Sequence, residues 1–170
     1  MVVQSVGDVG FILVRLLKEA GAAVSFSEVD DEKAGRCAVE TGANRVPAEA
    51  VFDVDADVLA PCAVGEVLTE EVARRLGAKA IAGAANNQLA TDRAGEILQQ
   101  RGIWYAPDFA ANAGAVIVGF ESGVGRASTA LDAVRRIEQR VERVFDYAVA
   151  RGVTTTEAAI ALARARLSAQ

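Results

Sequence analysis

The chain has 170 residues, of which 52% are hydrophobic and 24% are charged, and its formal net charge is −5. This composition is typical of one compact, well-buried domain and argues against a disordered chain. The net negative charge argues against nucleic acid as a partner, because binding to a phosphate backbone needs a basic protein surface. Since no apolar stretch reaches the roughly 18 residues of a membrane span and the start lacks a basic secretion signal, we expect no membrane partner and a cytoplasmic location.

Two residue types are informative through their scarcity. The chain contains no histidine, which removes the commonest general base and the commonest metal ligand. Its two cysteines, Cys37 and Cys62, fit a reducing compartment better than a disulfide framework, and no CxxC pair indicates a metal site. We expect no bound metal and no catalytic triad that uses imidazole. Cys37, which falls within a helical stripe, is expected in the core.

Strand-like and helix-like segments alternate along most of the chain. The opening strand is followed by an amphipathic helix that should end at Gly21. Further strands are expected at residues 23–28, 44–46, 57–61, 79–83 and 103–107, and helices at residues 30–42, 69–76 and 92–100. The alternation predicts an α/β fold with a doubly wound parallel sheet, Rossmann-like, and C-terminal helices from Ser128 onward, the last at residues 155–167. We expect residues 1–170 to form one dinucleotide-binding domain.

In such a sheet the ligand crevice lies at the carboxyl ends of the strands. The expected loops there read SVGDVG, EVDD, APCAVG, GAANN and APDFAANAG. The first one lacks one glycine of the GxGxxG pattern, but its setting between a strand and an amphipathic helix favours a dinucleotide site. Gly7 would let the main chain approach a pyrophosphate, Gly10 would let the helix pack on the strand, and N–H groups at the helix start would bind the anion.

Asp8 is the more serious departure from this pattern. A carboxylate about 6 Å from a diphosphate would cost roughly 1–3 kcal/mol of binding free energy at an effective dielectric constant near 20. The alternative is that Asp8 is the N-cap of the helix. Ser5 replaces the first glycine of the pattern and is small, so it remains compatible with the turn.

Glu28 ends the second expected strand about 18 residues after Gly10, where dinucleotide-binding folds place an acid on the adenosine ribose hydroxyls. With Asp30 and Asp31 nearby, a 2′-phosphate would be repelled, which favours NAD over NADP. The alternative is that Glu28 only helps to start the next helix.

Polar or sulfur-bearing side chains occur in the later loops. Cys62 directly follows a proline at a strand end, so it either touches a nicotinamide ribose or is a small buried apolar residue, and we do not propose it as a nucleophile. Asn86, Asn87 and Asn112 offer carboxamides that can pair with a nicotinamide amide, although asparagine is also common at turns.

Four segments, VVQSVGDVG, DVLAPCAVG, IAGAANNQLA and YAPDFAANAGAVI, together resemble the cofactor domain of the Glu/Leu/Phe/Val amino-acid dehydrogenases, nearest to leucine, valine and phenylalanine dehydrogenases. The resemblance spans residues 2 to about 167, and its last three motifs are far more specific than the glycine loop. It implies NAD as the cofactor and oxidative deamination of apolar amino acids as the activity of the whole family enzyme.

The resemblance also implies roles for individual positions. Glu28 stands where the family carries an aspartate for the adenosine ribose, and Asn112 stands where it carries an asparagine near nicotinamide and substrate. Val116 and Gly119 match positions that line the pocket for the substrate side chain. The implied positions for the pyrophosphate are Gly7, Asp8, Val9 and Gly10. Those beside the nicotinamide riboside are Cys62, Ala63 and Asn86.

Four residues depart from the family pattern. Ser5 stands for the first glycine of the loop and Asp8 for a usual asparagine. Glu66 stands for the second glycine of the APCA loop, and Ala115 for the glycine after NAG.

The resemblance further implies a substrate domain, with two lysines and an aspartate for binding and chemistry, that these 170 residues do not contain. The three lysines present do not substitute for them. Lys18 lies roughly 12 Å along the first helix from its phosphate end, Lys79 starts a strand and so sits at the wrong edge of the sheet, and Lys33 looks like a solvated helix residue. We expect this chain to bind cofactor without turnover, and catalysis to need a separately supplied substrate domain.

Two other interpretations stay open. The fold can serve as a binding module without chemistry, one that senses a nucleotide or mediates association, or the sequence can be a piece of a longer protein. In the absence of a covering domain, apolar surface at the strand ends would be exposed, which predicts a homodimer or another protein partner.

Overall fold

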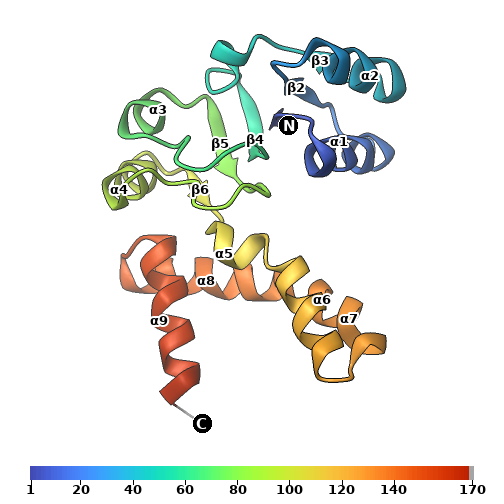
Figure 1. Cartoon of the computed structure of the whole chain (residues 1–170). Helices are drawn as coiled ribbons and strands as arrows, with labels where there is room; N and C mark the ends of the chain where they lie inside the picture. The colour runs from blue at the N-terminus through green and yellow to red at the C-terminus, as the bar shows by residue number, and fades with distance from the viewer. Residues whose placement is uncertain (169–170) are drawn as a thin grey trace. The chain divides into compact units, whose positions relative to one another are not determined.

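The computed structural model describes residues 1–168 and divides the chain into two compact units, unit 1 (Met1–Tyr105) and unit 2 (Ala106–Gln170). Unit 1 contains a sheet with its helices, and the regular elements in the described part of unit 2 are all helices (Figure 1). Among the described residues, no helix combines the length and the apolar character that crossing a membrane requires.

Unit 1 is built on six parallel strands in the order β3-β2-β1-β4-β5-β6. The strands are β1 (Val2–Gln4), β2 (Ser25–Ser27), β3 (Asn44–Arg45), β4 (Ala56–Pro61), β5 (Ala78–Ile81) and β6 (Trp104–Tyr105). The chain starts in the middle of the sheet, winds outward to β3, and returns through β4 to the other edge. This order is the doubly wound, Rossmann-like arrangement, so the predicted fold class is confirmed.

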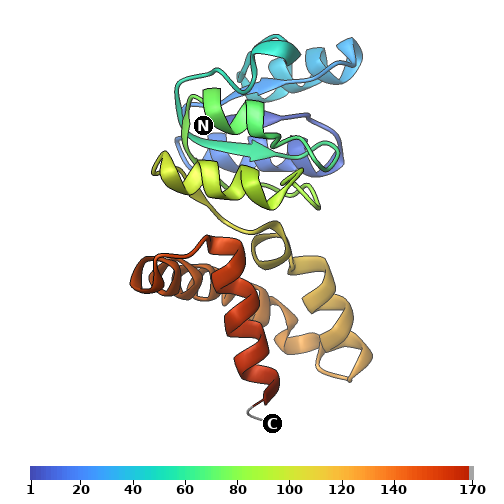
Figure 2. The same cartoon turned by 90° about the vertical axis from the view of Figure 1, so that its left-hand side faces the viewer.

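Four helices connect the strands of unit 1, with α1 and α2 on one face of the sheet and α3 and α4 on the other (Figures 1 and 2). They are α1 (Asp8–Glu19), α2 (Asp31–Thr41), α3 (Glu70–Arg75) and α4 (Asp92–Gln100), and a short 3₁₀ helix spans Ala48–Ala50. The neighbours Val2 and Val3 are both fully buried but belong to different cores, because successive strand side chains point to opposite faces. Cys37 is fully buried in the core under α1 and α2, as predicted.

Unit 2 consists of α5 (Asp108–Ala111), α6 (Gly114–Gly123), a 3₁₀ turn at Ala127–Thr129, α7 (Ala130–Arg135), α8 (Ile137–Arg151) and α9 (Thr155–Ser168). A small core around Val144, Ala148 and Ala158 joins α8 to α9. Thr154 and Glu157 begin α9 with a capping box, because each accepts a hydrogen bond from the backbone N–H of the other, at 2.8 and 3.2 Å.

Two features of unit 2 differ from the sequence-based expectation. Residues 107–112, expected as part of a loop, include the short helix α5, and the following segment forms α6, which we did not predict. The helical stripe expected from Ser128 onward is divided at Arg136 into α7 and α8. No residue of α6 is buried, so this helix lacks the one-sided burial that produces a readable period.

Candidate functional site

The turn between β1 and α1 is the first part of the candidate site. It begins with Ser5, whose φ of 69° is a left-handed conformation that residues with a side chain rarely adopt. The backbone N–H of Ser5 donates to the carbonyl of Ser27 at the end of β2, at 2.8 Å. Ser5 therefore takes the conformation for which a glycine is the usual residue at the start of this turn.

Gly10, in the first turn of α1, lies directly against this turn. A Cβ atom added to Gly10 would stand 2.1 Å from the carbonyl oxygen of Ser5 and 3.3 Å from Cβ of Cys62. The tight approach of the helix to the strand end that we predicted for Gly10 is therefore present. It also brings Cys62, at the end of β4, into the same corner as the first turn.

Gly7 and Asp8 form the start of α1. Gly7 is the N-cap, with φ −61°, and no side chain caps this end of the helix. The alternative interpretation of Asp8 as the N-cap is wrong, because Asp8 is the first residue of the helix itself and is exposed, as is Val9. A Cβ at Gly7 would meet no atom within 4 Å, so the protein leaves open space above this residue.

The carboxylate of Glu28 lies on the other side of the same turn and is only 8% exposed. Oε2 accepts hydrogen bonds from the Ser5 hydroxyl and the Val6 N–H, both at 2.9 Å. Oε1 accepts from the N–H groups of Val29, at 2.8 Å, and Asp30, at 3.1 Å. Burial alone would raise the pKa of Glu28, but these four hydrogen bonds to the charged form outweigh it and lower the pKa below its ordinary value.

The neighbouring acids at the end of β2 are also held in place. Asp30 caps α2 by accepting from the N–H groups of Glu32 and Lys33. Arg45, at the end of β3, donates to the carbonyl oxygen of Glu28 at 2.8 Å and forms an ion pair of 2.7 Å with Asp31. Asp30, and not Glu28, is therefore the side chain that caps α2, whereas the carboxylate of Glu28 bonds the β1–α1 turn.

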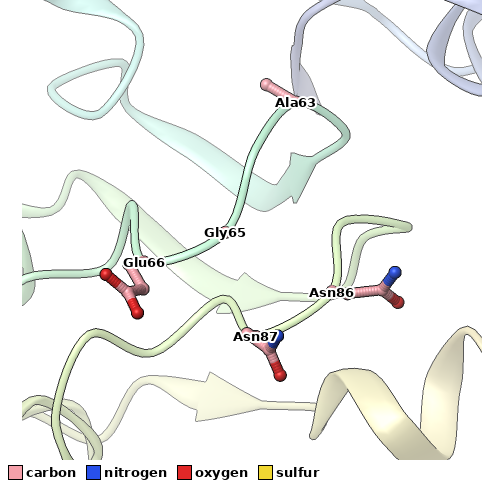
Figure 3. A pocket seen from close by; sticks show the side chains of 5 residues that line it. All are labelled: Ala63, Gly65, Glu66, Asn86 and Asn87. Carbon is pink, nitrogen blue, oxygen red and sulfur yellow. The ribbon is translucent and has the colours of Figure 1, made fainter.

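A pocket of about 380 Å³ lies between the β4–α3 and β5–α4 loops (Figure 3). Its lining consists of Ala63, Gly65, Glu66, Asn86 and Asn87. Glu66 and Asn87 have positive φ angles of 59° and 50°, and the Glu66 N–H donates to the Asn87 carbonyl at 2.6 Å. A Cβ at Gly65 would lie 2.7 Å from the carbonyl oxygen of Asn86, so the two loops are in close contact.

The loops that follow β1, β4 and β5 therefore share the carboxyl edge of the sheet. Cys62 connects two of them, because its N–H donates to the carbonyl of Gln4 at 2.9 Å. The side chain of Cys62 is half-buried, and burial raises the pKa of its thiol although a backbone hydrogen bond at Ala84 lowers it. A protonated thiol is a poor nucleophile.

The three candidates for the substrate pocket lie in unit 2. Asn112 is the C-cap of α5, and its N–H donates to the Asp108 carbonyl at 2.8 Å. Val116 and Gly119 lie on α6, where Val116 is 75% exposed and a Cβ at Gly119 would meet no atom within 4 Å. Within the described part of unit 2, this surface of α6 is uncovered.

The lysines are placed as expected. Lys79 and Asp57, near the starts of β5 and β4, form an ion pair of 2.8 Å at the sheet edge opposite to the candidate site. Lys33 is an exposed residue of α2 that pairs with Asp30 at 3.8 Å, and Lys18 lies in the last turn of α1.

Sequence reasoning missed two aspects of the site. It did not anticipate that Glu28 would bond the turn that contains Ser5, 23 residues earlier in the chain. It also did not anticipate the left-handed backbone of Glu66. Both Ser5 and Glu66 stand where the resembled family carries glycine. This shared departure from glycine was the signal in the sequence that could have indicated left-handed backbone at both positions.

The strand order and the parallel crossovers define the class of the fold, a Rossmann-like α/β fold. The chain belongs to the Glutamate/Leucine/Phenylalanine/Valine dehydrogenase family, because the model of that family matches residues 25–169. The resemblance seen in the sequence is thereby confirmed.

Individual relatives agree with this assignment. The chain is 37% identical over 166 residues to leucine dehydrogenase from Thermoactinomyces intermedius, covering 97% of this chain and 45% of the relative. It is 36% identical to phenylalanine dehydrogenase from Caldalkalibacillus thermarum, covering 97% of this chain and 46% of the relative. The crystal structure of L-tryptophan dehydrogenase from Nostoc punctiforme matches with a TM-score of 0.95 at 36% identity, over 99% of this chain and 52% of that one. The chain thus spans about half the length of the relatives that it matches.

Proposed function

We propose that unit 1 binds NAD and that the chain is the cofactor-binding part of an amino-acid dehydrogenase acting on apolar amino acids. The turn between β1 and α1 carries this proposal. It combines an uncapped helix start, open space above Gly7 and the close approach at Gly10, a combination suited to a diphosphate. The similarity to leucine, phenylalanine and L-tryptophan dehydrogenases supports an apolar substrate side chain.

The residues present fit a dinucleotide along the carboxyl edge of the sheet. The turn at residues 7–10 would hold the pyrophosphate, and the corner formed by Cys62, Ala63 and Asn86 would lie beside the nicotinamide riboside. Of the acids that follow β2, Asp31 is paired with Arg45, but the carboxylates of Glu28 and Asp30 would repel a 2′-phosphate, which favours NAD over NADP.

Bound NAD would supply the hydride acceptor, while the protein supplies position and proton transfer. Deamination also needs a base poised near neutral pH. The chain has no histidine, Lys79 is paired with Asp57 at the opposite edge of the sheet, and Lys33 is paired with Asp30 after β2, where the adenosine and not the nicotinamide would lie. We therefore propose that these 170 residues bind NAD without turnover and that a substrate domain outside them provides the missing groups.

Titration of the chain with NADH, followed by nicotinamide fluorescence and by calorimetry, tests the proposal. We expect NADH to bind more tightly than NADPH. We expect Asp8→Asn to tighten NADH binding about tenfold. This factor corresponds to the lower part of the roughly 1–3 kcal/mol that a carboxylate close to the diphosphate would cost. Asp55→Asn is the matched control, because Asp55 is an exposed acid just before β4, at the opposite edge of the sheet.

The outcomes are distinct. Tighter binding in Asp8→Asn and unchanged binding in Asp55→Asn would support a pyrophosphate site at the start of α1. Absence of heat and of fluorescence change with NADH, NADPH and adenosine nucleotides, in the unmodified chain and in Asp8→Asn, would refute NAD binding and favour an association module. Deamination of leucine after addition of a relative's substrate domain would support the dehydrogenase role.

We also propose a cytoplasmic location and a protein partner for this chain. The free thiols of Cys37 and Cys62 support a reducing compartment such as the cytoplasm. The exposed apolar residues of α6, which include Val116 and Phe120, support a protein partner, either the substrate domain or a second copy of the chain. Size-exclusion chromatography with light scattering would separate a monomer from a homodimer.

A further inference from the structure

The carboxylate of Glu28 uses its full hydrogen-bonding capacity inside the protein. An ionised carboxylate offers about four acceptor positions, two on each oxygen. Four donors occupy them: the Ser5 hydroxyl and the Val6 N–H on Oε2, and the Val29 and Asp30 N–H groups on Oε1. A ribose hydroxyl could donate to this carboxylate only if it displaced one of these donors.

Two of the four donors, the Ser5 hydroxyl and the Val6 N–H, lie at the left-handed residue of the β1–α1 turn. Ser5 has a φ of 69°, and both its hydroxyl and the next N–H reach the same oxygen, at 2.9 Å each. From the other side, the Ser5 N–H is fixed to the Ser27 carbonyl at 2.8 Å. Glu28 and Ser27 together hold Ser5 in a conformation that glycine would adopt without such help.

The position of Ser5 in turn determines where α1 begins. The Ser5 carbonyl oxygen is the atom that Gly10 approaches most closely, at 2.1 Å from the position of an ideal Cβ. If Ser5 relaxed to an extended backbone, the position of this carbonyl relative to the first turn of α1 would change. The start of the helix, where we place the pyrophosphate, would move with it.

We propose that Glu28 is a positioning residue that clamps the β1–α1 turn in its ligand-binding conformation through Ser5 and Val6, instead of accepting the adenosine ribose hydroxyls. The inference rests on the proposed binding of NAD by unit 1. It assigns Glu28 a task that follows from the serine: the carboxylate compensates for the missing glycine. Its effect on a ligand is therefore exerted through the turn and does not depend on the ribose.

Glu28→Gln tests the clamp, because glutamine keeps the shape and one accepting oxygen but cannot accept from two pairs of donors. Glu32→Gln is the matched control, an exposed acid of α2 whose loss removes the same charge. The probes are ADP and 2′,3′-dideoxy-ADP, which differ only in the ribose hydroxyls. We expect Glu28→Gln to weaken both about tenfold and by the same factor, and Glu32→Gln to change neither by more than about twofold.

Rescue is the second arm. Ser5→Gly, introduced into Glu28→Gln, should recover most of the lost affinity for both nucleotides, because glycine needs no clamp at this φ angle. The clamp is overturned if Glu28→Gln weakens ADP but not 2′,3′-dideoxy-ADP, or if Ser5→Gly gives no recovery.

A third measurement separates failure of the clamp from failure of NAD binding. If the unmodified chain binds neither NADH nor ADP, the proposed function fails, and urea unfolding then decides on the clamp. The clamp predicts that Glu28→Gln destabilises unit 1 and that Ser5→Gly suppresses this loss in the double variant. Strictly additive effects of the two substitutions would overturn it.

Discussion

Replacement of Gly10 by alanine should destabilise unit 1 strongly. The added Cβ would stand 2.1 Å from the Ser5 carbonyl oxygen, whereas ordinary van der Waals contact begins at 3.4 Å, so the backbone must move by about 1.3 Å. Overpacking of this kind costs about 3 kcal/mol, because the obstacle is backbone and cannot rotate away. A loss of that size lowers the melting temperature of a unit of about 100 residues, the size of unit 1, by about 12–24 °C.

Gly35→Ala is the matched control for Gly10→Ala. Gly35 also lies inside a helix, α2, but a Cβ there would meet no atom within 4 Å. Alanine should therefore stabilise this position by about 0.5–1 kcal/mol through its better helix propensity. Urea unfolding followed by the fluorescence of Trp104, the single tryptophan and a residue of β6, reports on unit 1 directly. Equal unfolding midpoints for the two variants would refute the argument from close approach.

Three further predictions concern titratable groups and a helix cap. Because hydrogen bonds lower the pKa of Glu28 below 4.5, the stabilisation by its carboxylate should be complete above that pH and should be lost as the pH falls through the lowered pKa. The difference in urea midpoint between the unmodified chain and Glu28→Gln should therefore stay constant from pH 5 to 7 and shrink below pH 4.5. Burial raises the thiol pKa of Cys37 and of Cys62, so iodoacetamide at pH 7.5 should label Cys62 slowly and Cys37 only after unfolding. Mass spectrometry would measure the labelling, and rapid labelling of Cys37 in the folded chain would contradict its burial. Thr154→Val removes the hydroxyl that accepts from the Glu157 N–H and should cost about 1 kcal/mol, measured by helical circular dichroism during urea unfolding; no change would mean that the capping box does not stabilise α9.

The parts of the fold that sequence predicted are those with strong local signals. The alternation of short apolar strands and amphipathic helices gave the sheet and its winding, since each buried face leaves a readable period. Gly10 was recognised because its role depends on a local strand-turn-helix setting. In unit 2, by contrast, α6 has no buried residue, and its glycines and exposed valines carry no periodic signal.

The unpredicted parts of the site depend on contacts between distant segments. Glu66 takes a left-handed backbone because its N–H reaches Asn87 while the adjacent Gly65 is pressed against Asn86, about 20 residues along the chain. The bond between Ser5 and Glu28 likewise joins the ends of two neighbouring strands. A single sequence gives the residue types at such positions but not which partner each one meets.

The contact between the β4–α3 and β5–α4 loops has a consequence for how this part of the protein can vary. The N–H groups of Glu66 and Leu68 donate to the carbonyls of Asn87 and Gln88, and a bridge joins Leu68 to Leu89. An insertion or deletion in one loop would put these pairs out of register unless the other changed length as well. Changes in the sequence of the β4–α3 and β5–α4 loops should therefore replace side chains and leave the lengths of the two loops constant.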